Sequence, residues 1–311
     1  MNSKFPHGLM FHHFHDNKKH LKTQGSITRL QLSKIIKFVG VKNILTPENF
    51  CEKLQKKKLN KNDKCITFDD SLLCQYDIAL PVLEDFNLKA FFFVTTSVFS
   101  SKPDNLEVYR YFRVNCYQNL DDFYKAFFSI LSSKIKNKIN YFIKKISYYK
   151  KNFKFYSHND ILFRIYRDFI LNDKEYDSLM FRLFKSKNFN PKKHYQKLFL
   201  SKKNVVKISN LGHSIGLHSH THPTDLKKLQ YLEQYQEYNK NLKYLNNVLK
   251  NKKKIYSMSH PCGSYDSKTL NILTKMNIDI GFLALMQNTY NKKKNNLIIP
   301  RQDHSNLIKF I

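Results

Sequence analysis

Short, continuous apolar runs recur toward both ends of the chain, and longer stretches with helical periodicity separate them. We predict buried strands at residues 65–68, 90–94, 215–217 and 280–285. Apolar residues without alternation are typical of strands that are covered on both faces, as in parallel sheets. Strands that alternate with helices therefore indicate a largely parallel α/β architecture.

Two of the intervening helices can be placed by their periodicity and by an N-cap residue. Apolar side chains keep helical spacing across residues 226–249, where either Thr224 or Asp225 is expected to be the N-cap. Asp266 is expected to cap a second helix, which carries Leu270 and Leu273. Both predicted helices lie between the last two predicted strands.

The middle of the chain, residues 101–204, has a different pattern. It contains no glycine, and apolar residues across 120–146 recur at steps of three and four. A second patch, residues 161–170, is dense in aromatic and aliphatic side chains. The pattern predicts several amphipathic helices inserted between residues 1–100 and 205–311. The aromatic and lysine residues could cover a glycan or a lipid-linked substrate, although such stripes more often form a core.

The net charge is extreme for a chain of 311 residues, because 54 basic residues against 24 acidic residues give +30. Nucleic acid, an anionic membrane surface or an anionic substrate could each explain the excess. The chain is also rich in Lys, Asn, Ile, Phe and Tyr, so a compositional bias with solvated lysines is the simpler explanation. The basic runs 56–58 and 252–254 match no nucleic-acid-binding motif, so charge alone supports such a partner.

The cysteines and the apolar runs bear on the compartment. Five cysteines are scattered without close pairs, which argues for a reducing environment. The polar stretch 11–16 begins too early for a signal peptide, and no run approaches the roughly 18 apolar residues that span a bilayer. We therefore predict a cytoplasmic protein, with peripheral contact to the anionic inner face of the membrane as a further expectation.

Two adjacent carboxylates, Asp69 and Asp70, follow the predicted strand 65–68. The carboxyl ends of parallel strands line the crevice in which α/β proteins bind ligands. The pair could therefore take part in chemistry, with a turn that brings both side chains into one site. The structural alternative is that Asp70 caps a following helix across residues 71–86.

Three histidines within five residues form the second cluster of candidate chemistry. His218 and His222 are four apart, which would put them on one side of a helical turn, whereas His220 would point elsewhere. Carboxylate and imidazole groups suit a borderline divalent ion; zinc is the first choice, and cobalt, nickel and manganese fit as well. A carboxylate beside the metal ligand could deprotonate a water, so these are the parts of a metal-assisted hydrolase.

Four stretches of the chain resemble, in order, motifs of the polysaccharide deacetylases, the NodB-homology group of carbohydrate esterases. They are Thr67-Phe68-Asp69-Asp70, His218-Ser219-x-x-His222, Ser259-His260-Pro261-Cys262-Gly263-Ser264-Tyr265 and Pro300-Arg301-Gln302-Asp303. Any one match would be weak, but four in order are specific. The resemblance covers about 1–100 and 205–311 and leaves the helical middle outside it.

The resemblance implies a distorted (β/α) barrel, built from residues 1–100 and 205–311, with the helical subdomain 101–204 inserted. It implies that Asp70, His218 and His222 hold a divalent metal ion. It also implies that Asp69 is the general base for the attacking water.

By the same resemblance, the third motif contributes to substrate binding. The backbone N–H of Cys262, after Pro261, would help to hold the oxyanion, and Tyr265 completes this motif. The products would be a sugar amine and a small carboxylic acid.

The sequence departs from the family pattern in three places. Ser71 stands where a glycine usually follows the two aspartates. An arginine that many members place in the third motif is missing, so orientation of Asp69 would fall to Arg301. The leucine-x-histidine motif that usually supplies the general acid near the end is also missing.

The first residues offer a replacement for that acid. The stretch 9–12 has a strand-like pattern that ends in His12, similar to circularly permuted members of the family. We expect His12 to be the general acid, with His13 as the second choice and Asp303 as the carboxylate that orients the imidazole. A solvated or merely metal-binding histidine stretch is the alternative.

The combined expectation is a metal-dependent hydrolase that removes the N-acetyl group of an amino sugar during surface-polysaccharide or LPS assembly. Because no export signal is evident, the expected substrate carries a nucleotide or a lipid phosphate, which the positive charge would suit. One alternative is a sugar N-deformylase with the same mechanism. A non-catalytic glycan- or membrane-associated module is another, and nucleic-acid binding on charge alone is a third.

Overall fold

The computed structural model describes residues 6–100, 105–152, 156–284 and 295–311. Within these residues, seven parallel strands close into a barrel. Each strand pairs with the next along the chain, and β7 returns to pair with β1. The strands are β1 (Gly8–Phe11), β2 (Cys65–Phe68), β3 (Phe91–Val94), β4 (Ser214–Leu217), β5 (Ser257–Ser259), β6 (Ile280–Leu283) and β7 (Ile299–Asp303).

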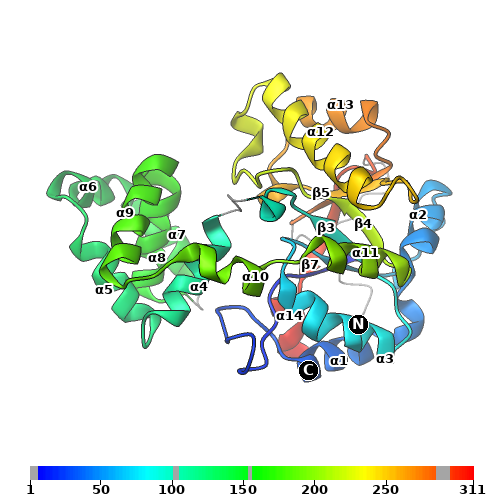
Figure 1. Cartoon of the computed structure of the whole chain (residues 1–311), viewed down its shortest axis with the longest axis horizontal. Helices are drawn as coiled ribbons and strands as arrows, with labels where there is room; N and C mark the ends of the chain where they lie inside the picture. The colour runs from blue at the N-terminus through cyan, green and yellow to red at the C-terminus, as the bar shows by residue number, and fades with distance from the viewer. Residues whose placement is uncertain (1–5, 101–104, 153–155, 285–294) are drawn as a thin grey trace. The chain divides into compact units, whose positions relative to one another are not determined.

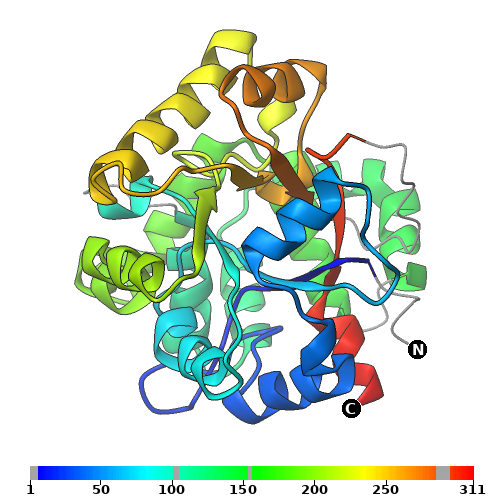
Figure 2. The same ribbon diagram turned by 90° about the vertical axis from the view of Figure 1, so that its right-hand side faces the viewer.

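The chain divides into two compact units. The barrel unit comprises Met1–Asn105 and Tyr195–Ile311, and the helical unit comprises Leu106–His194 (Figure 1). In the barrel unit, a ring of helices surrounds the strands (Figure 2). These helices are α1 (Arg29–Val39), α2 (Pro47–Gln55), α3 (Leu80–Asp85), α10 (Tyr195–Leu198), α11 (Lys202–Asn210), α12 (Tyr231–Val248), α13 (Ser267–Lys275) and α14 (His304–Leu307). None of the described helices combines the length and the apolar character needed to cross a membrane.

Two helix starts test the expected N-caps. The prediction for α13 is confirmed, since Asp266 accepts a hydrogen bond from the backbone N–H of Thr269. The prediction for α12 is wrong, because Gln230, with Glu233 three residues later, forms its N-terminal cap. Residues 226–228 form a separate short 3₁₀ turn ahead of the helix. Thr224 and Asp225 therefore precede the helix that they were expected to cap.

The barrel interior is aromatic at the amino-terminal end of the strands. Phe91, Phe93 and Phe282 are buried there together with Phe50 of α2. Gly8 of β1 is required by this packing, because a Cβ atom at this position would lie 2.5 Å from Cγ of Arg301. The close approach lets the long arginine side chain run along β1 toward the other end of the barrel.

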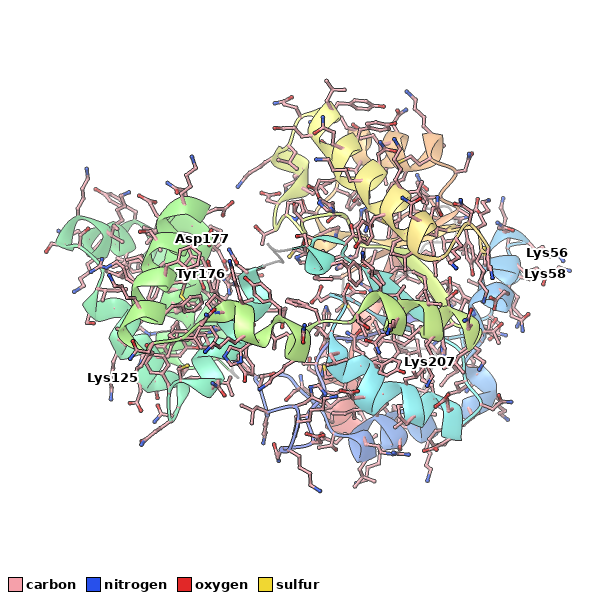
Figure 3. All side chains as sticks on the ribbon, viewed as in Figure 1. Lys56, Lys58, Lys125, Tyr176, Asp177 and Lys207 are labelled. Carbon is pink, nitrogen blue, oxygen red and sulfur yellow. The ribbon has the colours of Figure 1, made fainter. Side chains whose placement is uncertain are left out.

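The helical unit has a mainly aromatic and aliphatic interior. The rings of Phe123 and Phe127 are fully buried, and the ring of Tyr109 meets that of Tyr176 edge-on at 5.2 Å (Figure 3). The helices of this unit are α4 (Asn105–Asn115), α5 (Leu120–Ser129), α6 (Ser133–Asn137), α7 (Ile143–Asn152), α8 (His158–Ile165) and α9 (Asp173–Ser186).

The expected strands are found within one residue of their predicted starts. Strands β2, β3, β4 and β6 correspond to the apolar runs, although the last predicted residue, Leu285, lies outside the described residues. Strands β5 and β7 were not predicted, because Ser257–Ser259 and Ile299–Asp303 carry polar residues among the apolar ones. The polar residues in these two strands take part in the site described next.

Candidate metal centre

The polar residues predicted from the sequence converge at the carboxyl end of the barrel. His12 follows β1, Asp69 and Asp70 follow β2, and His218 follows β4. Because all strands are parallel, these positions share one end of the barrel. The structure thus brings together residues that are up to 206 positions apart in the chain, counting from His12 to His218.

A tight turn after β2 directs the second carboxylate into the site. Asp70 and Ser71 both have left-handed backbone conformations, with φ of 73° and 58°. The Ser71 hydroxyl accepts a hydrogen bond of 2.8 Å from the backbone N–H of Thr95 on the neighbouring chain segment. Strand β2 therefore ends in this turn, and the helix expected across 71–86 begins at Leu73 and runs through a π-helical segment (Gln75–Ala79) into α3, which ends at Asp85. The carboxylate of Asp70 faces two histidines rather than the N-terminus of a helix.

Asp70, His218 and His222 form a compact group that could hold a metal ion. One ligand atom from each residue lies within 4.8 Å of the others. The Asp70 Oδ1 atom is 3.2 Å from Nε2 of His218 and 3.4 Å from Nε2 of His222. One carboxylate oxygen and two imidazole nitrogens are the donor set of a borderline divalent ion with open coordination positions.

The hydrogen bond on the far side of His218 indicates which nitrogen faces the group. Its Nδ1 atom is 2.9 Å from the carbonyl oxygen of Ser259, which can only accept, so Nδ1 carries a proton. In the neutral ring, Nε2 then presents a lone pair toward the carboxylate of Asp70. Two acceptors that face each other need a shared cation, either a proton or a metal ion. The donor set therefore fits a divalent ion.

The two histidines reach this geometry without a helix, so the expected helical turn is wrong. Residues 218–222 form an irregular turn in which Ser219 and His222 have φ of 61° and 57°. The Ser219 hydroxyl accepts a hydrogen bond from the backbone N–H of His222 at 3.0 Å, and the two imidazole centroids are 4.8 Å apart. His220 turns to a different partner, because its Nδ1 atom contacts the Thr96 hydroxyl at 2.9 Å.

Asp69 is held by Arg301 in a fully buried, two-pronged ion pair. The guanidinium NH1 and NH2 groups donate to Oδ1 and Oδ2 of Asp69 at 2.8 and 2.6 Å. NH2 also donates to the Ser259 hydroxyl, which in turn donates to Asp69 at 3.1 Å. Burial would raise the pKa of Asp69, but the charges of Arg301 and His218 outweigh it and lower the pKa to about 2. Asp69 is therefore ionised at neutral pH.

His12 lies near both carboxylates. Its Nε2 atom lies 3.9 Å from Oδ2 of Asp69 and 3.9 Å from Oδ2 of Asp70. The His12 side chain is 26% exposed, so solvent or a ligand can reach it. The ring of His13 is buried and lies 6.3 Å from that of His12, centroid to centroid.

Asp303, the last residue of β7, caps α14 through a hydrogen bond from the backbone N–H of Ser305. Burial would raise the pKa of Asp303, but His304, the hydrogen bonds to Ser305 and the charge of His12 lower it. Asp303 thus caps α14 and also lies close enough to His12 for their charges to interact.

The third motif forms a short turn after β5. Pro261 is buried, whereas Cys262 is exposed and has a left-handed backbone with φ of 51°. The ring of Tyr265 packs at 5.1 Å against that of His260, whose Nε2 atom contacts the carbonyl oxygen of Leu297 at 2.7 Å. The turn is therefore braced through His260, which directly follows the strand that supplies Ser259.

Two supporting residues were not identified from the sequence. Ser259 uses both its carbonyl and its hydroxyl in the site, although it lies within the third motif and could have been singled out there. Asn241 of α12 is fully buried; its side-chain oxygen accepts from the backbone N–H of His218, and its amide donates to the carbonyl of Val94. Nothing in the helical pattern around Asn241 distinguishes it from exposed polar residues, so no sequence signal marked it.

Comparison with known proteins identifies similarity to one family of enzymes. The polysaccharide deacetylase family model matches residues 171–281, which include α9, β4 and β5. The match begins inside 101–204 and does not reach 1–100, so its extent differs from the one expected from the motifs. No curated protein sequence matches the chain.

The fold is that of solved polysaccharide deacetylases. The chain superposes on the deacetylase PplD of Streptococcus pyogenes, solved with acetate, with a TM-score of 0.54 and 18% identity over 96% of this chain and 92% of that one. The chain superposes on IcaB of Ammonifex degensii with a TM-score of 0.56 and 13% identity, over 96% of this chain and 91% of that one. It superposes on the BpsB deacetylase domain of Bordetella bronchiseptica with a TM-score of 0.55 and 13% identity, over 97% of this chain and 96% of that one.

Proposed function

We propose that this chain is a polysaccharide deacetylase that removes the N-acetyl group of an amino sugar with the help of a divalent metal ion, because a model of that family matches residues 171–281 and the fold is shared with solved deacetylases. The observation that carries the proposal is the convergence of the Asp70, His218 and His222 ligand atoms within 4.8 Å of one another. They lie beside an ionised carboxylate, Asp69, that is fixed by an arginine. Acetate, present with the similar streptococcal deacetylase, is the acid that N-deacetylation releases.

Asp70, His218 and His222 are the proposed metal ligands. Zinc is our first choice, and cobalt, nickel and manganese suit the same donor set. When bound, such an ion polarises the acyl carbonyl and acidifies a water. The hydrogen bond from His218 Nδ1 to the carbonyl of Ser259 fixes the ring with Nε2 directed at the ligand position.

Asp69 is the proposed general base. Arg301 keeps it ionised and fixes the plane of its carboxylate, so one oxygen can accept a proton from the attacking water. A base with a pKa of about 2 accepts protons only from an acidified water. Arg301 thus acts as a positioning residue for Asp69.

His12 is the proposed general acid, which must protonate the amine as it leaves. Support comes from its distance of 3.9 Å to both carboxylates and from its partial exposure, which lets substrate approach. Asp303 is proposed to assist by its charge, and His13 is the second choice for the acid. Backbone and side-chain groups of Pro261, Cys262 and Tyr265 are proposed to bind the substrate around the acyl group.

The proposed substrate is an amino sugar that carries a nucleotide or a lipid phosphate, in the cytoplasmic assembly of a surface polysaccharide. The net charge of +30 supports an anionic carrier, and the five reduced cysteines are compatible with a reducing compartment. One alternative is a sugar N-deformylase, because removal of an N-formyl group requires the same chemistry as removal of an N-acetyl group. A non-catalytic glycan-binding module would keep the fold without turnover.

A paired assay of acetate and formate separates these functions. The purified protein, stripped of metal and then reloaded with zinc, is incubated with N-acetylated and N-formylated sugar nucleotides. We expect zinc-dependent acetate release that exceeds formate release. Formate alone would assign the deformylase, and metal binding without release of either acid from any acylated amino sugar would support the non-catalytic module.

A further inference from the structure

The helical unit contains one segment, residues 134–151, whose charged side chains are all positive. It carries seven lysines and no aspartate or glutamate. The segment comprises α6, a 3₁₀ turn (Lys138–Phe142) and α7, which follow one another along the chain. The lysines are Lys134, Lys136, Lys138, Lys144, Lys145, Lys150 and Lys151.

Large apolar side chains of the 134–151 segment lie exposed among these lysines. The exposed fractions are 87% for Tyr141, 61% for Ile143 and 58% for Tyr148. By contrast, Phe123 and Phe127 of the neighbouring α5 are completely buried. Core formation therefore explains these two rings of α5 but not the three exposed side chains of the 134–151 segment.

A phenylalanine outside the 134–151 segment extends its exposed apolar surface. Phe169 is 40% exposed and packs 6.1 Å from the ring of Phe142, centroid to centroid. The ammonium group of Lys145 lies 3.5 Å from the centroid of the Phe169 ring. Lysine and aromatic groups are thus interleaved at this surface, as in helices that lie in the interface of a bilayer.

We propose that the 134–151 segment docks the protein onto an anionic lipid surface. Its lysines would contact lipid headgroups, and the side chains of Tyr141, Ile143 and Tyr148 would enter the boundary between headgroups and acyl chains. Charge complementarity favours an anionic partner. The exposed Ile143 favours a lipid over a nucleic acid, because tyrosines can also stack on bases, whereas an aliphatic side chain gains from the boundary between headgroups and acyl chains. This inference does not depend on the proposed hydrolytic activity.

Vesicle binding by the full chain tests the proposal. Cosedimentation is measured with phosphatidylcholine vesicles that contain, or lack, phosphatidylglycerol. We expect binding only to the anionic vesicles. The variant K144Q/K150Q/K151Q should weaken it by at least about tenfold, since each lysine near an anionic surface strengthens the binding. The matched control K56Q/K57Q/K58Q removes the same charge from exposed lysines of the barrel unit and should change binding by less than about threefold (Figure 3).

A second pair of variants tests the apolar contribution. Tyr141→Ser with Tyr148→Ser should weaken binding by at least about tenfold. The control, Leu30→Ser with Leu232→Ser, removes two side chains of the barrel unit that are 64% and 69% exposed and should have little effect. Far-UV circular dichroism verifies that each variant is folded.

Three results would overturn the proposal. Equal losses in both lysine variants would mean that only net charge matters. A loss in the lysine variant without a loss in the tyrosine variant would mean that the contact is electrostatic alone and that the apolar side chains do not enter the lipid. No binding of the wild-type chain to anionic vesicles would exclude lipid docking directly.

Discussion

The two units of this chain bury different kinds of groups. At the carboxyl end of the barrel, Asp69, Arg301 and His218 are buried as ions or hydrogen-bonded polar groups that pair with one another. In the helical unit the interior consists mainly of stacked and edge-on rings, such as Phe123 with Phe163 at 5.3 Å. Buried ionic groups are costly unless each has a partner, whereas apolar rings need only fit. We therefore expect substitutions at the carboxyl end of the barrel to alter chemistry first and those in the interior of the helical unit to alter stability.

The largest expected effect is the loss of hydrolysis in Asp69→Asn. The amide keeps the shape of the carboxylate but cannot accept the proton from the attacking water. We expect activity to fall by at least about a thousandfold, with metal content near that of the wild type. Acid release and metal analysis of the purified variant measure the two quantities. Activity within about tenfold of the wild type would remove Asp69 from the proposed mechanism.

Substitution of Arg301 should be the most destabilising change in the barrel. In Arg301→Gln, the buried Asp69 loses two charged hydrogen bonds and remains without a countercharge, which costs about 3–5 kcal/mol in the free energy of unfolding. The matched control is Arg29→Gln, since Arg29 pairs with Asp85 where both side chains are 57% exposed. Urea unfolding of the two variants measures the difference. Equal costs would contradict the contrast between buried and exposed ion pairs.

Much of the barrel can be predicted from the sequence because its central strands are continuous apolar runs. The run before Asp69 identifies both β2 and the position of the two carboxylates at its end. Four helix-separated strands then imply a parallel sheet, and a parallel sheet implies that the strand ends meet. The proximity of Asp70 and His218 follows from this reasoning without any contact information.

The remainder of the site depends on tertiary contacts that leave no periodic signal. Strand β7 includes Pro300 and Arg301, so its pattern does not indicate a buried strand, yet the arginine is fully buried because it reaches Asp69. The irregular turn across 218–222 is held by Ser219 and Asn241, and spacing alone suggested a helix there instead. Local propensity was overruled by these hydrogen bonds in both cases.

The third prediction concerns the pH dependence of stability. It depends on a buried histidine at the amino-terminal end of the barrel strands. Burial, together with the charges of Lys89 and Lys253, lowers the pKa of His213 to about 4. Its Nδ1 atom accepts a hydrogen bond from the backbone N–H of Ala90, which requires the neutral ring. The unfolded chain takes up this proton near pH 6.5, so stability should fall as the pH decreases from about 6.5 to about 4.

His213→Asn isolates this contribution, because the asparagine side-chain oxygen can still accept from Ala90 but does not titrate. The fall in unfolding free energy between pH 7 and pH 4.5 should be smaller in the variant by up to about 3 kcal/mol. It should not vanish, since burial also lowers the pKa of His260 to about 4. Urea unfolding at both pH values measures the change, and an unchanged fall would show that His213 is protonated in the folded protein or compensated by neighbouring groups.

The smallest predicted effect compares two tyrosine–aspartate hydrogen bonds inside the helical unit. The Tyr124 hydroxyl donates to Asp160, which is 4% exposed, whereas the Tyr109 hydroxyl donates to the half-buried Asp177. Tyr124→Phe should cost about 1–2 kcal/mol, because the buried carboxylate loses a donor that water replaces poorly. Tyr109→Phe should cost less, since water can reach Asp177. Thermal unfolding of both variants measures the order, and metal content should stay at the wild-type level in each. A larger cost for Tyr109→Phe would mean that ring packing, not burial of the acceptor, sets the strength of these contacts.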